Sequence, residues 1–324
     1  MTKDVALICD DKYCLPTAIC IQSIIDNSIL DCTLTVHVCT SGLSADSIQI
    51  IEGLSCDKVH VEINTFEGEY FENKFKSVSQ KTHVTPTALI KFELPNYFYY
   101  LDSLLYVDSD IIIKGNLSDL LNFNLADVYL AASYEFWKYV NATRYNFSKY
   151  DKVFYFNSGV MLLNLRKMRD DKIPEKLWDY KLNKTKTKLM DQESLNAICG
   201  IKVECLPLIW NFNPIFLNSI YLQDINKVYG SSYKDLVSLE SDVKIIHYVG
   251  KHDKPWIYKN AHMRKYWDES CKKVFSLENI KKGLKDAEKT SFSSSVASIM
   301  EKNGIPGLLS YMIYAIKLKL GKKC

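Results

Sequence analysis

Val5-Ala6-Leu7-Ile8-Cys9, followed by Asp10-Asp11, is the stretch of sequence that decides the fold class. Five consecutive apolar residues predict a strand that is buried on both faces, and the two carboxylates end it. Further elements are predicted from hydrophobic spacing: a helix over 15–26, a strand over 34–39, a helix over 44–54 capped by Ser44, and a strand over 59–63. This alternation predicts an α/β fold with a parallel sheet and right-handed crossovers.

The carboxyl ends of the parallel strands are where such a sheet binds its ligand. Asp10, Asp11 and Asp108 each follow a predicted strand, so we expect them at this edge. No Gly-x-Gly-x-x-Gly follows the first strand, and the sequence contains no Gly-x-x-x-x-Gly-Lys-Ser/Thr. A nucleotide bound here would therefore need another counter-charge for its phosphates.

A second apolar stretch, Leu104 to Ile113, is interrupted by the motif Asp108-Ser109-Asp110. Residues i and i+2 of a strand point to the same side, so the Asp108 and Asp110 carboxylates would converge on one point. Mg²⁺ and Mn²⁺ prefer oxygen ligands of this kind. The same three residues are also typical of a turn at the end of a strand. The motif alone is consistent with both interpretations.

Composition indicates an ordinary globular protein. The 324 residues are 47% hydrophobic and 24% charged, enough for one large domain or two modest ones. A net charge of +3 is too small to indicate nucleic-acid binding. The ten cysteines include no Cys-x-x-Cys pair, and several lie in apolar stretches, as reduced thiols do. With no signal-peptide segment before the first strand, we expect a cytoplasmic protein.

Taken in order, the motifs of this chain resemble glycosyltransferase family 8, whose members are retaining enzymes of the GT-A fold. Five signatures carry the resemblance: Asp10-Asp11-Lys12-Tyr13, Asp108-Ser109-Asp110, Phe156-Asn157-Ser158-Gly159-Val160, Asp191-Gln192, and His247-Tyr248-Val249-Gly250 with Lys254-Pro255-Trp256. The resemblance implies that residues 1–267 form a Rossmann-like, nucleotide-sugar-binding catalytic domain with a mixed, mainly parallel central sheet.

The resemblance also implies a metal site. Asp108, Asp110 and His247 would bind Mn²⁺, or alternatively Mg²⁺, and the diphosphate of the donor would complete the coordination shell. Outside its motif, His247 would be interpreted as a histidine packed at a strand end. Lys254 would contact the β-phosphate and offset the charge that grows on it. A solvated surface lysine is the alternative for Lys254.

Nucleotide contacts are implied for the first motif. Asp10 would hydrogen-bond the uracil of UDP and Tyr13 would stack on it, as a planar base requires. Lys12 departs from the pattern of the family's bacterial galactosyltransferases, in which asparagine is usual at this place. The remaining members of these motifs that are expected to line the donor site are Asp11, Ser109 and Gly250.

Three further residues would bind the donor sugar. Lys91 occupies the place of a basic residue, usually arginine, that holds sugar and phosphate; lysine keeps the charge and loses the bidentate geometry. Asn157 and Asp191 would hydrogen-bond the sugar hydroxyls. A turn asparagine and a helix N-cap are the alternatives for these two.

The implied reaction transfers a hexose, glucose or galactose, from a UDP-sugar to a glycan or glycolipid hydroxyl with retention of configuration, as in lipopolysaccharide synthesis. Gln192 occupies the family's candidate catalytic position, and an amide is a poor nucleophile. We therefore expect front-face substitution, with Asp191 or Glu193 as alternative nucleophiles of a double displacement. A glycogenin-like autoglucosylating enzyme and a non-catalytic UDP- or glycan-binding protein are the alternative functions.

Residues 268–324 are predicted to form a basic, helical C-terminal extension. Between residues 277 and 324, nine lysines stand against four acidic residues, a net charge of +5. The apolar segment 305–320 is shorter than the roughly 20 residues of a membrane span. A helix lying on the anionic inner face of the cytoplasmic membrane is predicted, with packing against the catalytic domain as the alternative.

Overall fold

A computed structural model of the protein describes residues 3–27, 32–68, 71–74, 76, 86–138, 155–183, 191–250, 253–258 and 260–276. Its strands are β1 (Lys3–Ile8), β2 (Leu34–Thr40), β3 (Val59–Thr65), β4 (Ser103–Val107), β5 (Ile111–Ile113), β6 (Leu130–Tyr134), β7 (Phe156–Asn164), β8 (Val203–Cys205) and β9 (Ile245–His247).

The α-helices are α1 (Cys14–Asn27), α2 (Ala45–Glu52), α4 (Leu94–Tyr97), α5 (Ser118–Leu121), α7 (Leu165–Asp170), α8 (Ile173–Asn183), α9 (Gln192–Cys199), α10 (Ser219–Tyr229), α11 (Leu236–Asp242) and α12 (Arg264–Val274). Short 3₁₀ turns are η1 (Asp11–Tyr13), η2 (Pro86–Phe92), η4 (Leu208–Trp210) and η5 (Pro214–Phe216). Among the described residues, no helix is long and apolar enough to cross a membrane.

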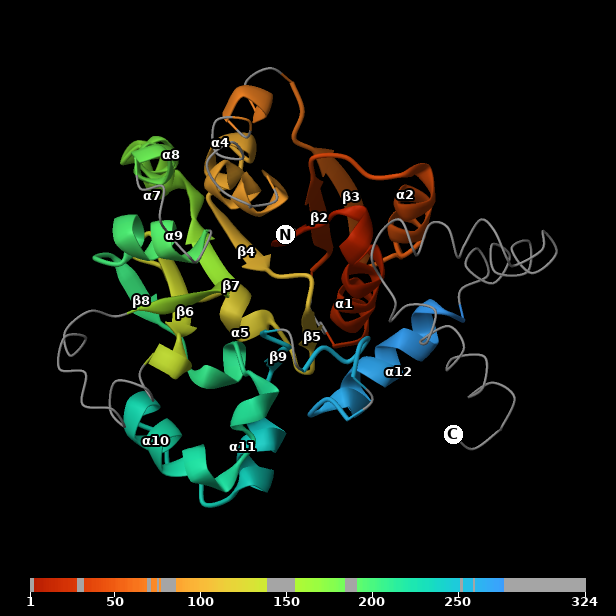
Figure 1. Ribbon diagram of the computed structural model, residues 1–324, viewed down its shortest axis with the longest axis vertical. Coiled ribbons are helices and arrows are strands. Elements are labelled where there is room, and N and C mark those ends of the chain that lie inside the picture. Colours follow the sequence, from red (N-terminus) through yellow and green to blue (C-terminus); the bar gives the residue numbers. More distant parts are fainter. Residues whose placement is uncertain are drawn as a thin grey trace.

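The central sheet has seven strands in the order β3-β2-β1-β4-β7-β6-β8 (Figure 1). The neighbours β3, β2, β1 and β4 are parallel, and so are β6 and β8. β7 is antiparallel to both of its neighbours, β4 and β6. The prediction of a mixed, mainly parallel α/β sheet is therefore confirmed. A second, two-stranded antiparallel sheet pairs β5 with β9.

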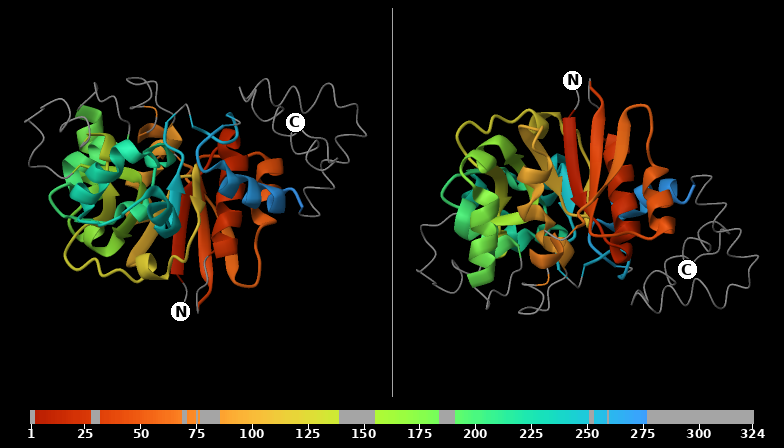
Figure 2. Two further views of the ribbon diagram at one scale, coloured as in Figure 1. Left: turned by 90° about the horizontal axis from the view of Figure 1, so that it is seen from below. Right: turned by 90° about the horizontal axis from the view of Figure 1, so that it is seen from above.

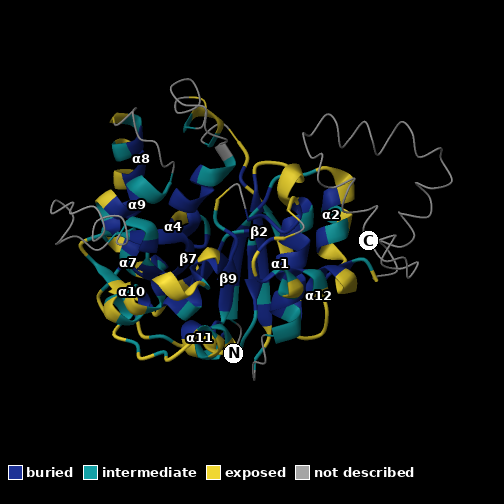
Figure 3. Cartoon of the chain, turned by 60° about the horizontal axis from the view of Figure 1, so that its bottom comes forward, coloured by how far each residue is buried: buried dark blue, intermediate teal, exposed yellow. Residues whose placement is uncertain are grey.

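Apolar side chains of the strands alternate between two cores, one on each face of the sheet. In β1, Val5 and Leu7 belong to the core under α1, whereas Ala6 belongs to the core under η2 and α8. Helices lie on both sides of the sheet in Figure 2. Figure 3 shows that the strands are the buried interior of the molecule. This double burial explains why β1 is a continuous apolar run instead of an alternating one.

Helix α12 packs along α1, and both views agree on this arrangement (Figures 1 and 2). Trp267, Cys271 and Val274 are buried in the same core as α1. The domain boundary predicted between residues 267 and 268 therefore falls inside one packed helix, and the packed unit extends at least to Val274. Residues 277–324, which carry the predicted membrane-surface segment, lie outside the described residues.

The predicted N-terminal elements are confirmed, including the helix that Ser44 begins. The Ser44 side chain accepts a hydrogen bond from the backbone N–H of Ser47 at 3.3 Å, as an N-cap does. The alternative of a turn asparagine is wrong for Asn157. Asn157 and its neighbours up to Gly159 do not form a turn, because they lie within β7, in the middle of the sheet.

Candidate active site

The motif Asp108-Ser109-Asp110 forms the turn between β4 and β5. The turn is held by Ser109, whose hydroxyl donates to the backbone carbonyl of Ile8 at 2.7 Å and accepts from the hydroxyl of Thr17 at 2.9 Å. These bonds tie the turn to the end of β1 and to α1. The two carboxylates thus converge through a turn and not through strand geometry. The Ser109 hydroxyl is thus used within the fold, and a place for Ser109 in the donor site stays a prediction.

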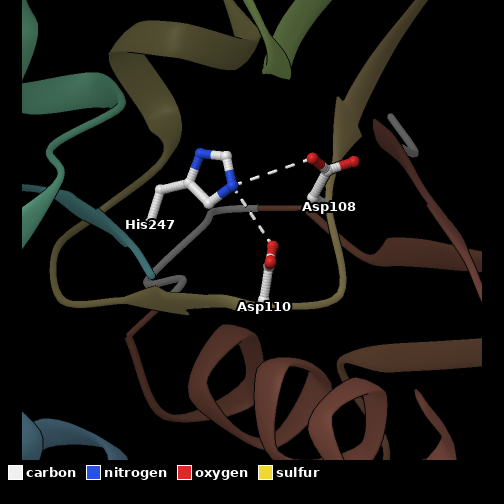
Figure 4. Close-up of side chains that lie close together, drawn as sticks. All are labelled: Asp108, Asp110 and His247. Atoms are coloured by element: carbon white, nitrogen blue, oxygen red, sulfur yellow. Dashed lines mark ion pairs between the residues drawn. The ribbon is translucent and has the colours of Figure 1, made fainter. Parts of the chain in front are cut away.

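His247 reaches the same place from the far end of the chain. It ends β9, whose antiparallel register with β5 sets His247 opposite Ile111. Its Nε2 lies 3.2 Å from Asp110 Oδ1 and 3.7 Å from Asp108 Oδ2. Figure 4 shows both carboxylates turned toward the imidazole ring. The structure therefore brings together the three residues predicted to bind metal, with ligand atoms all within 4.8 Å of one another.

This group fits a divalent cation. Two carboxylates and an imidazole are a donor set that suits Mn²⁺. Asp110 Oδ1 is buried and receives no hydrogen bond in the described part of the chain, so a negative oxygen is left to be satisfied. Space for the group depends on Gly159, since a Cβ there would overlap the His247 ring and lie 2.9 Å from Asp108 Oδ2.

Lys254 lies beside the cluster and is not the solvated surface lysine considered as its alternative. Only 8% of the residue is exposed, and its ammonium group contacts Asp110 Oδ2 and the carbonyl oxygen of Tyr248. Burial acts to raise the pKa of Asp110, but Lys254 and His247 outweigh it and hold that pKa well below its usual range. Asp110 is therefore ionised at any physiological pH.

Lys91 joins the predicted metal site to the predicted sugar site. Its buried ammonium group lies 3.0 Å from Asp108 Oδ1 and 2.5 Å from Asp191 Oδ2. The Ser158 carbonyl oxygen is 3.3 Å away, and the Tyr106 ring centre is 4.7 Å away. Burial acts to lower the pKa of Lys91, but the two carboxylates raise it above its usual value, so Lys91 stays charged.

Asp191 occupies the N-cap position of α9 but does not act as a side-chain cap. It makes no capping hydrogen bond; instead its Oδ2 accepts from the Ser158 hydroxyl at 3.1 Å and pairs with Lys91. Burial acts to raise the pKa of Asp191, and the charge of Lys91 more than offsets this and lowers it. Asp191 is thus an ionised carboxylate at the N-terminus of α9.

Gln192 and Asn157 share one carboxylate partner, Glu135, which directly follows β6. Gln192 Nε2 donates to Glu135 Oε2 at 3.2 Å, and Asn157 Nδ2 donates to the same oxygen at 2.8 Å. Asn211 Nδ2 donates to Asn157 Oδ1 at 2.9 Å. The sequence-based prediction did not include Glu135 or Asn211. In the sequence, Glu135 could be found as a carboxylate directly after a buried strand. Asn211 could be found as an isolated amide between Trp210 and Phe212.

The residues predicted to hold the base lie at the carboxyl end of β1. Asp10 accepts a hydrogen bond from the Tyr13 N–H at 3.1 Å, and Tyr13 is 39% exposed with its ring edge-on to Trp256 at 6.1 Å. Burial, together with the carboxylates of Asp110 and Asp108, raises the pKa of Tyr13 to about 12, so the ring stays neutral.

Two other predicted donor-site residues have structural constraints of their own. Asp11 Oδ1 accepts from the Ser44 N–H, the Ser44 hydroxyl and the Ser47 hydroxyl at 2.7–2.9 Å, which ties it to the start of α2. Gly250 follows β9 with φ of +88°, a conformation that glycine adopts without strain.

Comparison with known proteins gives a consistent result. The sequence profile of glycosyl transferase family 8 matches residues 4–260. A lipopolysaccharide 1,2-glucosyltransferase of Escherichia coli is 28% identical over 255 residues, which are 76% of this chain and 71% of that protein.

Two solved structures share the fold. Galactosyltransferase LgtC, in complex with donor and acceptor sugar analogues, superposes with a TM-score of 0.64 at 20% identity over 86% of this chain and 99% of that one. The WbbM bifunctional glycosyltransferase superposes with a TM-score of 0.68 at 19% identity over 88% of this chain and 51% of that one. The predicted GT-A fold is confirmed by these superpositions.

Proposed function

This chain belongs to glycosyltransferase family 8, and from that premise we propose that it transfers a hexose from a UDP-sugar to a hydroxyl group of a glycan acceptor. The hexose is glucose or galactose. The similarity to a lipopolysaccharide 1,2-glucosyltransferase supports an acceptor in cell-surface lipopolysaccharide or a related glycan.

The observation that carries this proposal is the cluster of Asp108, Asp110 and His247 with an ammonium group on each side. Lys254 contacts Asp110 and Lys91 contacts Asp108, so three potential metal ligands and two buried cations surround one point. A divalent cation on these ligands, together with the two ammonium groups, would supply the positive charge that a diphosphate needs, and the sequence has no glycine-rich phosphate loop to provide it. We infer that Mn²⁺, or Mg²⁺, binds these three ligands together with the donor diphosphate.

Each residue then has a defined part in the transfer. Bound Mn²⁺ supplies a Lewis acid for the diphosphate leaving group. Lys254 moves from Asp110 toward the β-phosphate and offsets its growing charge. Lys91, Asp191 and Asn157 orient the donor sugar.

Retention of configuration is assigned to front-face substitution. Gln192 stabilises the oxocarbenium-like carbon of the sugar, and an oxygen of the departing UDP takes the acceptor proton. The Lys91 and Ser158 contacts of Asp191 support a binding role for this carboxylate over a nucleophilic one.

A UDP-release screen tests the proposal. The full-length protein is incubated with a panel of UDP-sugars and glycan acceptors, with Mn²⁺ or with EDTA. We expect UDP release with UDP-glucose or UDP-galactose that EDTA abolishes and Mn²⁺ restores, because the diphosphate loses its counter-charge without the metal. Release that is unaffected by EDTA, or confined to sugars other than hexoses, would contradict the proposal. Mass spectrometry of the protein itself detects self-glycosylation.

The basic segment 277–324 is proposed to hold the enzyme at an anionic membrane surface, where a lipid-linked acceptor would be found. The proposal rests on its net charge of +5 and its apolar segment 305–320. We expect the full-length protein to sediment with vesicles that contain anionic lipid and a 1–276 variant to remain in the supernatant. Equal sedimentation of the two would refute the proposal.

A further inference from the structure

One unbroken chain of side-chain hydrogen bonds runs from His247, the proposed metal ligand, to the amide of Gln192. His247 Nδ1 bonds Asn211 Oδ1 at 2.8 Å, and Asn211 Nδ2 bonds Asn157 Oδ1 at 2.9 Å. Asn157 Nδ2 and Gln192 Nε2 then meet on the same oxygen of Glu135, at 2.8 and 3.2 Å. We call these five residues the His247–Gln192 network.

Two backbone N–H groups fix the direction of every bond in the network. The Gly159 N–H donates to Asn157 at 2.9 Å, so the acceptor atom there must be the amide oxygen. Asn157 therefore presents its NH₂ to Glu135, and the NH₂ of Asn211 faces the Asn157 oxygen. In the same way, the Ser158 N–H donates to Gln192 Oε1 at 3.0 Å and turns the Gln192 NH₂ toward Glu135. Glu135 therefore accepts one hydrogen bond from Asn157 and one from Gln192.

This direction determines the tautomer of His247. Because Asn211 presents its oxygen, His247 Nδ1 must carry the hydrogen and donate it. Nε2 is then the ring nitrogen that faces Asp110 Oδ1 at 3.2 Å, where it can hold a proton or a metal ion. A divalent cation can replace that proton and contact both Nε2 and the Asp110 carboxylate. The network thus prepares His247 Nε2 as a metal ligand.

Burial indicates that the network is not incidental. Asn211 and Asn157 are 6% and 8% exposed, and Asn211 lies between the apolar Trp210 and Phe212. A buried amide has a desolvation cost that hydrogen bonds must offset, and apolar side chains would fill such a position at less cost. Both amide groups of the pair are instead bonded within the network. A hydrogen-bond partner on the other ring nitrogen sets the orientation of a metal-binding histidine and raises its affinity for the ion.

We propose that Asn211 and Glu135 are positioning residues that couple the metal ligand His247 to the amide of Gln192. Asn211 fixes the tautomer and ring orientation of His247. Glu135 holds Gln192 and Asn157 in one arrangement on the side of the donor sugar. The inference rests on the proposed function, because it assigns these residues to the metal and sugar sites of the same reaction.

Binding of the Mn²⁺–UDP complex tests the Asn211 half without turnover. Isothermal titration is carried out on the wild type, on Asn211→Ala and on the matched control Asn213→Ala. Asn213 is a buried asparagine of the same loop whose side chain caps η5, outside the network. We expect Asn211→Ala to bind the complex about 10- to 100-fold more weakly and Asn213→Ala to bind it like the wild type. Equal affinity of Asn211→Ala and the wild type would overturn the inference.

Steady-state kinetics test the Glu135 half through a conservative variant. The carbonyl oxygen of Glu135→Gln can accept from both Asn157 and Gln192, whereas Glu135→Leu accepts from neither. We expect Glu135→Leu to lower kcat up to about a hundredfold with a smaller change in the KM for the UDP-sugar, because Gln192 is no longer held in place. Glu135→Gln should keep most of kcat. An equal loss in the two variants would mean that Glu135 acts through its charge, and would overturn the positioning role.

The coupling itself is tested by the double variant Asn211→Ala/Glu135→Leu in the same titration. The free-energy effects of substitutions within one hydrogen-bonded network do not simply add. We expect the loss of Mn²⁺–UDP affinity in the double variant to be smaller than the product of the two single losses; a full product would show that the two residues act independently. A wild type that binds no Mn²⁺–UDP contradicts the proposed function, whereas a wild type that binds it beside an unaffected Asn211→Ala contradicts only this inference.

Discussion

Replacing Asp108 with asparagine is expected to reduce hexose transfer by at least about a thousandfold, the equivalent of about 4 kcal/mol of transition-state stabilisation. The variant keeps the size and shape of the side chain and removes one anionic ligand from the cluster with Asp110 and His247. The measurement is the initial rate of UDP release at saturating donor and Mn²⁺. Thermal unfolding followed by circular dichroism shows whether the fold is retained.

Asp102→Asn is the matched control. Asp102 is 64% exposed, directly precedes β4 and pairs with Arg166 on the surface. Exposed ion pairs of this kind contribute about 0–1 kcal/mol, so the control should keep its activity and nearly all of its stability. Activity of Asp108→Asn within about tenfold of the control, a difference of roughly 1.4 kcal/mol, would be incompatible with a metal ligand at this position.

Replacing Lys91 with methionine is expected to destabilise the protein by about 3–5 kcal/mol at pH 7, and to abolish transfer. Methionine fills the space of the buried lysine stem, but Asp108 and Asp191 then lose their shared cation. Breaking a buried ion pair by removing one partner leaves charge without compensation. The measurement is the free energy of unfolding from urea titration, with transfer assayed in parallel.

The pH dependence of this loss has a defined sign. In the wild type the pKa of Asp191 is lowered, so the stability that its ionised form contributes is present above the unfolded pKa of about 3.9 and is lost as the pH falls below it. In Lys91→Met, burial acts unopposed by Lys91 and favours the protonated carboxyl. The difference in unfolding free energy between the two proteins should therefore narrow from pH 7 toward pH 4.

Two control variants are compared with Lys91→Met. Lys273→Met removes a lysine that is 57% exposed and pairs with Asp26, and should cost less than about 1 kcal/mol. Lys91→Arg keeps the charge and should retain more stability than Lys91→Met. A Lys91→Met variant as stable as Lys273→Met would show that the buried ion pairs do not compensate the charge of Asp108 and Asp191.

The sequence predicted the fold from the order and character of its strands. β1, β2 and β3 with the helices between them follow from apolar runs and capping residues, because burial and helical period are local properties of the chain. It also predicted the carboxylates at the ends of β1 and β4. Their function followed from the resemblance to a family, since Asp108-Ser109-Asp110 alone was consistent with a turn as well as with a metal site.

The turn interpretation of that motif is confirmed, whereas the metal site stays a proposal that the grouping with His247 supports. Asp108 and Asp110 are in a turn, and the turn is what makes their carboxylates converge. The interpretation of Asn157 as a turn residue failed because the Asn157-Ser158-Gly159 sequence has turn-like composition, whereas its place in β7 is set by pairing with β4 on one side and β6 on the other. Sheet pairing over such separations overrides local propensity.

The sequence by itself determined the buried apolar strands, their succession along the chain and the chemical types of the groups that follow them. Only the tertiary structure decided which of those groups meet. The register of β5 with β9 places His247 beside Asp110, and packing of η2 brings Lys91 to Asp108 and Asp191. The contacts of Glu135 and Asn211 with the other site residues likewise exist only in the folded chain. The physical reason is that burial and periodicity are encoded residue by residue, whereas a contact between distant residues exists only after strand register and packing have closed the chain around it.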